Sequence, residues 1–246
     1  MRSILLAASL CALVLAGCRD DPVDSQVEIG DGSVTISGDD AVVPVLNWTP
    51  PAVDIPEDDA EAALVRAGEA LAADDLYATP DSAIPLYLAL ARTPGYERAA
   101  ARGLQRAQAR LLELGAQALV EVDMLDSAAG MRAAHEFAAV ARYLAPGDPE
   151  VVAYLERVDQ ADRLRELNRA AERALQAGDL GESGGGALAL FRQVLAERPG
   201  QPRAMQGMAA VESAMIRRAE LAADAADYRL ADEWLGHAAR VRPGFP

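Results

Sequence analysis

The chain has 246 residues, 51% of them hydrophobic, and its 38 Asp+Glu against 23 Lys+Arg give a formal net charge of −15. This charge argues against a basic nucleic-acid-binding surface, and the hydrophobic content excludes disorder over most of the length. Aromatic residues make up only 4% of the chain while alanine and leucine dominate, which is typical of helices and not of a β-sandwich. The two cysteines, Cys11 and Cys18, lie at the very start, so the remainder can hold no disulfide and no thiolate metal site.

The first residues have the pattern of a secretory signal. Arg2 precedes an apolar stretch from Ile4 to Gly17, which is too short to span a bilayer of about 30 Å as a helix. This stretch ends in Leu15-Ala16-Gly17-Cys18, which resembles the lipobox of bacterial lipoproteins. The resemblance implies a signal peptide over residues 1–17, cleavage between Gly17 and Cys18, and acyl chains on Cys18. Because Arg19 is not the aspartate linked to inner-membrane retention, it also implies the outer membrane, facing the periplasm. The alternative is ordinary secretory cleavage with an incidental Cys18.

The segment of residues 18–59 predicts a flexible, lipidated acidic tether. Between residues 19 and 59 there are eleven acidic residues, one basic residue and five prolines. Such a segment buries too little apolar surface to offset its chain entropy, and a flexible coil of this length reaches about 35 Å. Residues 27–36 alternate apolar and polar around Gly30-Asp31-Gly32. This pattern leaves a short hairpin as an alternative to a flexible coil in that stretch. Asp31, Asp39 and Asp40 lack the spacing of a calcium loop, and we expect solvated acids.

From residue 60 to residue 246 the chain repeats, in about four units. Pro-Gly pairs recur at Pro94, Pro146, Pro199 and Pro243, separated by 52, 53 and 44 residues. Proline-glycine ends one helix, and a second proline suits the first turn of the next. Long helices are therefore predicted over roughly 96–122, 149–177 and 202–225. Each unit is a helix, a turn and a shorter helix, with turns expected at Asp75-Leu76, Asp123-Met124, Gly178-Asp179-Leu180 and Asp227-Tyr228.

The fourth shorter helix carries a small residue, a larger one four residues on, a small one three later and then a proline. The others depart from this pattern: the first is one residue out of phase with its proline, the second has Phe137 as its bulky neighbour, and the third has Val194 in place of the second small residue. In chain order, the residues at these positions are Ala83, Tyr87, Leu90 and Pro94; Ala134, Ala138, Ala141 and Pro146; Ala187, Phe191, Val194 and Pro199; and Ala231, Leu235, Ala238 and Pro243. This pattern resembles the tetratricopeptide repeat (TPR), although these units are longer than the family's 34 residues. The resemblance implies an all-α, right-handed superhelical solenoid of helical hairpins.

Candidate catalytic and metal-binding patterns are weak. Residues 181–185 fit the G-x-S-x-G pattern around Ser183, but a helix precedes them where a hydrolase has a strand. His135-Glu136 begins like a zinc-protease motif, yet Ala139 stands where the second histidine belongs. We therefore predict no enzyme activity, no catalytic residue, no metal and no cofactor, with His135 and His237 on the surface. The aromatic residues at helical spacing line either the core or a binding groove, with the core favoured: Tyr143, Tyr154, Tyr228 and Trp234.

The two resemblances together imply a lipid-anchored scaffold or adaptor at the bacterial cell envelope. It would bind a protein or peptide partner through its helical repeats and would bind no nucleic acid; the contacting residues are unknown. An alternative starts from Pro246, which stands where earlier units begin their next long helix. On that reading the chain is the anchoring, partner-positioning region of a longer lipoprotein enzyme, for example with a following domain that resembles the formylglycine-generating enzymes.

Overall fold

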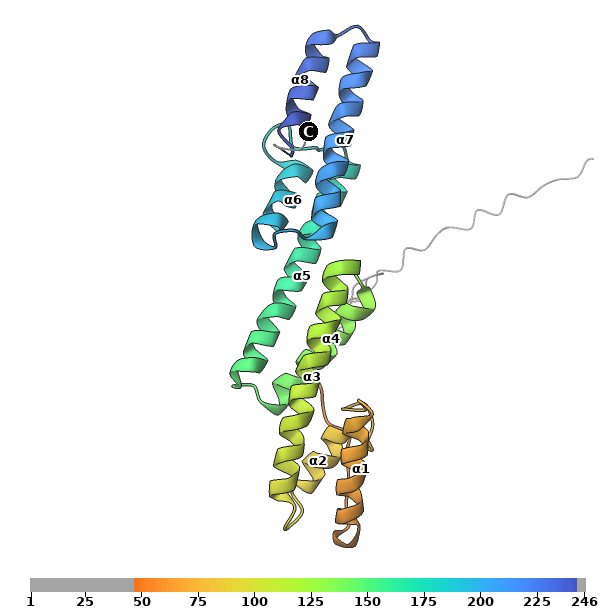
Figure 1. Cartoon of the computed structure of the whole chain (residues 1–246), viewed down its shortest axis with the longest axis vertical. Helices are drawn as coiled ribbons and strands as arrows, with labels where there is room; N and C mark the ends of the chain where they lie inside the picture. Colours follow the sequence, from red (N-terminus) through yellow and green to blue (C-terminus); the bar gives the residue numbers. More distant parts are fainter. Residues whose placement is uncertain (1–46, 243–246) are drawn as a thin grey trace, which may run out of the picture. The chain divides into compact units, whose positions relative to one another are not determined.

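The structure, a computed structural model, describes residues 47–242, and these form eight α-helices and one short 3-10 helix with no β-strand (Figure 1). The predicted all-α class is confirmed for this part of the chain. Nowhere in it is a helix both long and apolar enough to cross a membrane. The 3-10 helix spans Glu57–Asp59 and leads into α1 (Ala60–Ala72), α2 (Ala83–Leu90), α3 (Glu97–Leu125), α4 (Ala128–Leu144), α5 (Pro149–Gln176), α6 (Gly186–Glu197), α7 (Pro202–Asp224) and α8 (Tyr228–Ala239). The predicted cleavage and lipidation residues Gly17 and Cys18, and the possible hairpin at 27–36, lie outside the described residues.

The three predicted long helices correspond to α3, α5 and α7, but the end of α3 differs from the prediction. The helix continues through the expected turn at Asp123-Met124 to Leu125. The chain turns instead at Asp126, whose φ of 50° is left-handed, and the Ser127 side chain accepts a hydrogen bond from the backbone N–H of Gly130 at 2.9 Å. A serine oxygen satisfies a free N–H in the first turn of α4, so the stop signal is the Asp-Ser pair just beyond the predicted turn.

Helices that follow one another pack as pairs: α1 with α2, α3 with α4, α5 with α6 and α7 with α8. Each later long helix also packs against both helices of the preceding pair, so α3 contacts α1 and α2, α5 contacts α3 and α4, and α7 contacts α5 and α6. The buried residues accordingly form successive clusters along the described chain. Stacking buries a continuous core that no single pair could enclose.

The same turn ends the first helix of three of the four pairs. Asp74, Gly178 and Ala226 each have a left-handed φ of 60°, 78° and 60° after α1, α5 and α7. This conformation lets the following N–H reach back to a free carbonyl of the last helical turn. The donor is an aspartate N–H in each case, at 2.9 Å: Asp75 to Ala70, Asp179 to Ala174 and Asp227 to Ala222. The repetition seen in the sequence is therefore also a repetition of backbone geometry.

Large side chains lie against glycines where one pair meets the next helix. Tyr87 of α2 lies against Gly103 of α3, and Phe191 of α6 lies against Gly207 of α7. A β-carbon at either glycine would overlap the ring. Both pairs are separated by sixteen residues, so they occupy equivalent positions of the repeat.

In the second unit the large and small residues are exchanged. The equivalent positions are Ala138 of α4 and Tyr154 of α5. The Tyr154 ring is fully buried against Gly115 of α3, and its hydroxyl donates to the carbonyl of Ala134 at 2.9 Å. In this unit the large ring therefore comes from the long helix of the next pair and not from the short helix. The units can thus pack alike although their sequences differ.

Part of the segment predicted as a flexible tether is packed. We call residues 47–56 the strap. Trp48 lies edge-on to Tyr77 and Tyr143, with ring centroids 6.5 and 5.2 Å away, and Val53 and Ile55 pack against the core of α1 and α2. The predicted boundary between tether and repeats at residue 60 is therefore wrong for the strap. Its apolar side chains pack against the helices despite the acidic residues and prolines around them. The rest of the predicted tether lies outside the described residues.

Candidate functional site

Ser183 lies on the exposed loop between α5 and α6, and each histidine contacts other residues. His135 of α4 is mostly buried and its Nε2 lies 3.0 Å from Asp162 Oδ2 of α5. The prediction of a surface histidine is therefore wrong for His135, because α5 covers it. His237 of α8 packs against the ring of Trp234. Among residues 47–242 no group of three acidic, histidine or cysteine side chains is arranged to hold a metal ion.

The four aromatic residues weighed in the sequence have different surroundings. Tyr154 lies in the core, where burial raises the pKa of its hydroxyl. Trp234 is partly buried, with the guanidinium of Arg218 4.6 Å from its ring centroid. Tyr143 and Tyr228 are exposed, so the core prediction is wrong for these two.

A half-open cleft of about 170 Å³ lies between the second half of α3 and the middle of α5. A cavity of about 150 Å³ accepts a benzene ring, so the cleft has room for one branched or aromatic side chain. Apolar side chains from both helices form much of the wall, including Leu119 and Val120 of α3 and Leu164 of α5. The polar side chains of the lining are three arginines, one aspartate and one glutamine: Asp123, Arg157, Gln160, Arg165 and Arg198. The lining therefore combines apolar side chains with more arginines than carboxylates, in an acidic chain.

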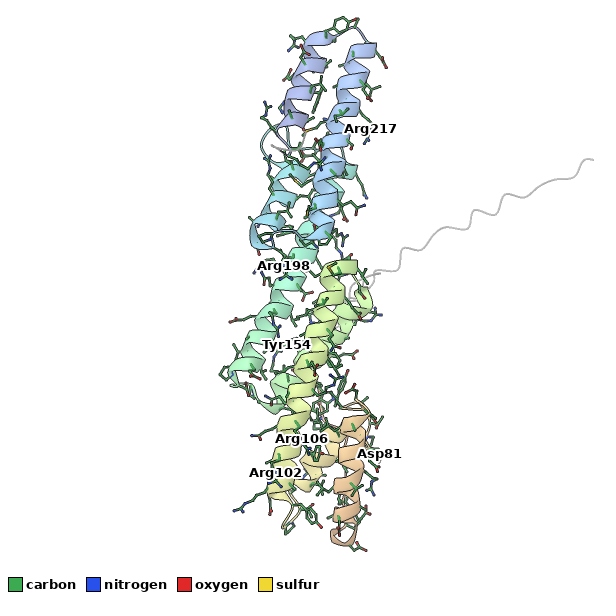
Figure 2. The ribbon with its side chains drawn as sticks, viewed as in Figure 1. Asp81, Arg102, Arg106, Tyr154, Arg198 and Arg217 are labelled. Atoms are coloured by element: carbon green, nitrogen blue, oxygen red, sulfur yellow. The ribbon has the colours of Figure 1, made fainter. Side chains whose placement is uncertain are left out.

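The charged side chains of the lining are held in place. Arg198, which follows α6, donates from Nη2 to Asp123 Oδ2 at 2.9 Å. Arg157 lies 5.6 Å from the centroid of the Tyr154 ring. Figure 2 labels Tyr154 of α5 and Arg198, which lies above it in that view. Since Arg157 has an aromatic partner and no bound carboxylate among residues 47–242, its guanidinium keeps free donors for a ligand.

One end of the cleft is fixed by a network across three long helices. Arg165 of α5 is almost fully buried and donates from Nε to Asp126 Oδ1 at 2.7 Å. Arg203 of α7 pairs with the same Asp126 and also binds Glu172 through Nε and Nη2, at 2.6 and 2.7 Å. The hydrogen bonds to Glu172 raise the pKa of Arg203 above its usual value. Such bidentate pairs give geometric specificity, so this end of the cleft is well ordered.

Apolar side chains continue outside the cleft along α3. Val120, Met124 and Leu125 are 61%, 59% and 76% exposed. Val120 and Met124 are four residues apart, so they lie one above the other on the same face. A contiguous exposed apolar surface beside a pocket is typical of a protein interaction site.

This site was not among the sequence-based predictions. The apolar stripe of α3 that faces the other helices includes the buried residues Leu111 and Ala118. Val120 and Met124 lie on nearly the opposite side of the same helix, given 3.6 residues per turn. That second set of apolar residues was the available signal, although only the position of α5 makes it a cleft.

Comparisons with known proteins give no relative: no protein-family model, no curated protein and no solved structure matches this chain. The reading of function therefore depends on the chain's own residues.

Proposed function

We propose that this chain is a lipid-anchored scaffold of the bacterial cell envelope, which binds a protein or peptide partner through a solenoid of TPR-like hairpins. Cys18 carries the lipid, and the anchor lies in the outer membrane facing the periplasm. The proposal for the anchor is supported by the lipobox-like residues Leu15-Ala16-Gly17-Cys18. The proposal for partner binding is supported by the paired helices and by the α3–α5 cleft.

The single observation that carries partner binding is the exposed apolar surface at the cleft. Monomeric proteins rarely leave several large apolar side chains together in water, because hiding them is favourable by about 25 cal/mol per Å². Val120, Met124 and Leu125 would be covered by a partner whose anchoring side chain enters the cleft. Central apolar anchors in a pocket typically supply most of the binding energy of an interface.

Site-specific photo-crosslinking in cells tests the proposal. A photo-reactive amino acid at Met124 of the full-length chain should give one dominant adduct, identified by mass spectrometry. The same amino acid at Leu221 of α7, which is 69% exposed and remote from the cleft in sequence, serves as the control and should not give it. Val120→Glu in the Met124 chain should abolish the adduct. Identical adducts from both positions, or an adduct that Val120→Glu leaves unchanged, would contradict binding at the cleft.

A further inference from the structure

A row of arginines lies on the exposed face of α3 before the cleft. Arg98, Arg102 and Arg106 are exposed and spaced by four residues, so their side chains lie on one face. None of the three has an ion-pair or hydrogen-bond partner within residues 47–242, whereas the next arginine, Arg110, binds Asp74 and Glu113 at 2.7 Å. Figure 2 shows Arg102 and Arg106 on the first half of α3. Like charges at this spacing destabilise a helix, so the row is unfavourable without an anion.

The arginine row and the cleft share one face of the helix. Arg102 and Val120 are eighteen residues apart, which is five full turns, so both lie on the same line along α3. Arg102 and Arg106, together with Gln105 and Ala109, line an open hollow at the start of this line. At 1.5 Å per residue, about 21 Å separates Arg106 from Val120. Between Arg106 and Val120 the same line passes Glu113, whose carboxylate is bound to Arg110 at 2.7 Å. One rigid helix thus carries the arginine row and the wall of the apolar cleft.

We propose that this track, from Arg98 to Val120, binds an extended acidic segment of the partner and that a bulky apolar residue of that segment enters the cleft. The proposal rests on the proposed function and names the chemistry of the partner. The spacing supports an extended segment. Arginines four residues apart in a helix repeat every 6 Å or so, and alternate residues of an extended chain repeat every 6.6 Å or so on one side. The remaining distance to Val120 takes about six extended residues.

Charge favours a carboxylate-bearing peptide over an anionic lipid surface. Residues 60–246 hold 27 acidic residues and 21 arginines, so the body as a whole is repelled by a negative surface. The row is one residue wide and lies on the same line of α3 as a cleft sized for one side chain. A linear segment matches this shape, whereas a lipid surface would need a broad cationic face. Arginine also suits carboxylates because its fork binds both oxygens.

Fluorescence anisotropy with the full-length protein in nonionic detergent tests the inference. The probe is a fluorescein-labelled peptide with three glutamates at alternate positions, a six-residue Gly-Ser spacer and a leucine. Binding should weaken about tenfold in Arg102→Gln/Arg106→Gln, since two exposed ion pairs each account for a few-fold change. Arg217→Gln, which removes an exposed arginine of α7 labelled in Figure 2, should bind as the unchanged protein does. Glutamine in place of glutamate, or serine in place of leucine, should weaken the peptide to a similar degree.

Several results would overturn the inference. The glutamate peptide failing to bind, the glutamine peptide binding equally well, or Arg217→Gln weakening binding as much as the double variant would each exclude a specific acidic track. Phosphatidylglycerol vesicles that bind the unchanged protein and not the double variant, with no peptide binding, would assign the row to lipid. The Met124 crosslink separates the two proposals. If Val120→Glu abolishes the crosslink while Arg102→Gln/Arg106→Gln leaves it at full yield, the cleft binds a partner and the acidic track is wrong.

Discussion

Gly207→Ala isolates the packing between one helix pair and the next. Alanine favours a helix interior over glycine by about 0.8–1 kcal/mol, so propensity alone predicts a gain in stability. The added methyl would overlap three atoms of the Phe191 ring, which is fully buried. Overpacking of this kind costs about 1–3 kcal/mol, and overlap with several atoms of a fully buried ring belongs in the upper half of that range. We therefore expect a net loss of about 1–2 kcal/mol.

Urea unfolding followed by circular dichroism at 222 nm measures this loss as a lower midpoint. Gly68→Ala in α1 is the matched control, because the nearest atom to its new methyl would be Tyr87 Oη at 4.0 Å. That variant should gain about 0.5–1 kcal/mol from propensity. Phe191→Leu should lower the penalty of Gly207→Ala when the two are combined, which a double-mutant cycle detects. A Gly207→Ala protein as stable as Gly68→Ala would refute the packing argument.

Three further predictions concern the anchor, the strap and the loop after α5. Cys18→Ser should leave the helical signal unchanged and move the protein from the membrane fraction to the soluble one; retention in membranes would contradict the lipid assignment. Trp48→Ala should lower stability by about 2 kcal/mol, below the 3–5 kcal/mol of a fully buried tryptophan because Trp48 is only partly buried, and should hasten cleavage of the strap in limited proteolysis. The pKa of Glu182 is lowered in the folded protein by a hydrogen bond from its own backbone N–H and by Arg218. Its contribution to the free energy of unfolding is therefore present above the pKa that Glu182 has in the unfolded chain, and is lost as pH falls through its pKa in the folded protein. Glu182→Gln should therefore lose less stability than the unchanged protein between pH 6 and pH 3, and equal losses would exclude this contribution.

The starts of α5 and α7 were predictable because they depend on neighbouring residues. Pro149 and Pro202 are the first residues of α5 and α7. A backbone N–H at this position has no partner within the helix, so a proline there loses no helical hydrogen bond. Pro85, which the pattern places inside a helix, is the third residue of α2 and so falls in the first turn, where its missing N–H breaks no helical bond. Local signals of this kind need no knowledge of the fold.

The strap and His135 were not predictable in the same way. Residues 19–59 are acidic and proline-rich. This composition does not indicate which residues Trp48 contacts. Its partner Tyr143 is far away in the sequence, on α4, so the contact exists only once the first two helix pairs have formed. His135 is covered by α5 for the same reason. Burial of single side chains in polar surroundings is set by the packing of helices, which the periodicity of one helix cannot show.

The length of α3 explains why the cleft forms where it does. In stacked repeats each unit usually touches only its neighbours, yet α3 contacts α7 as well as α5. The contact passes through Asp126 at the end of α3, which pairs with Arg203 of α7 and with Arg165 of α5. A helix that ended at the predicted turn, Asp123-Met124, would not place Asp126 there. The extra residues of α3 thus anchor the far end of the cleft, and the same helix carries the arginine row, so both parts of the proposed track belong to one rigid element.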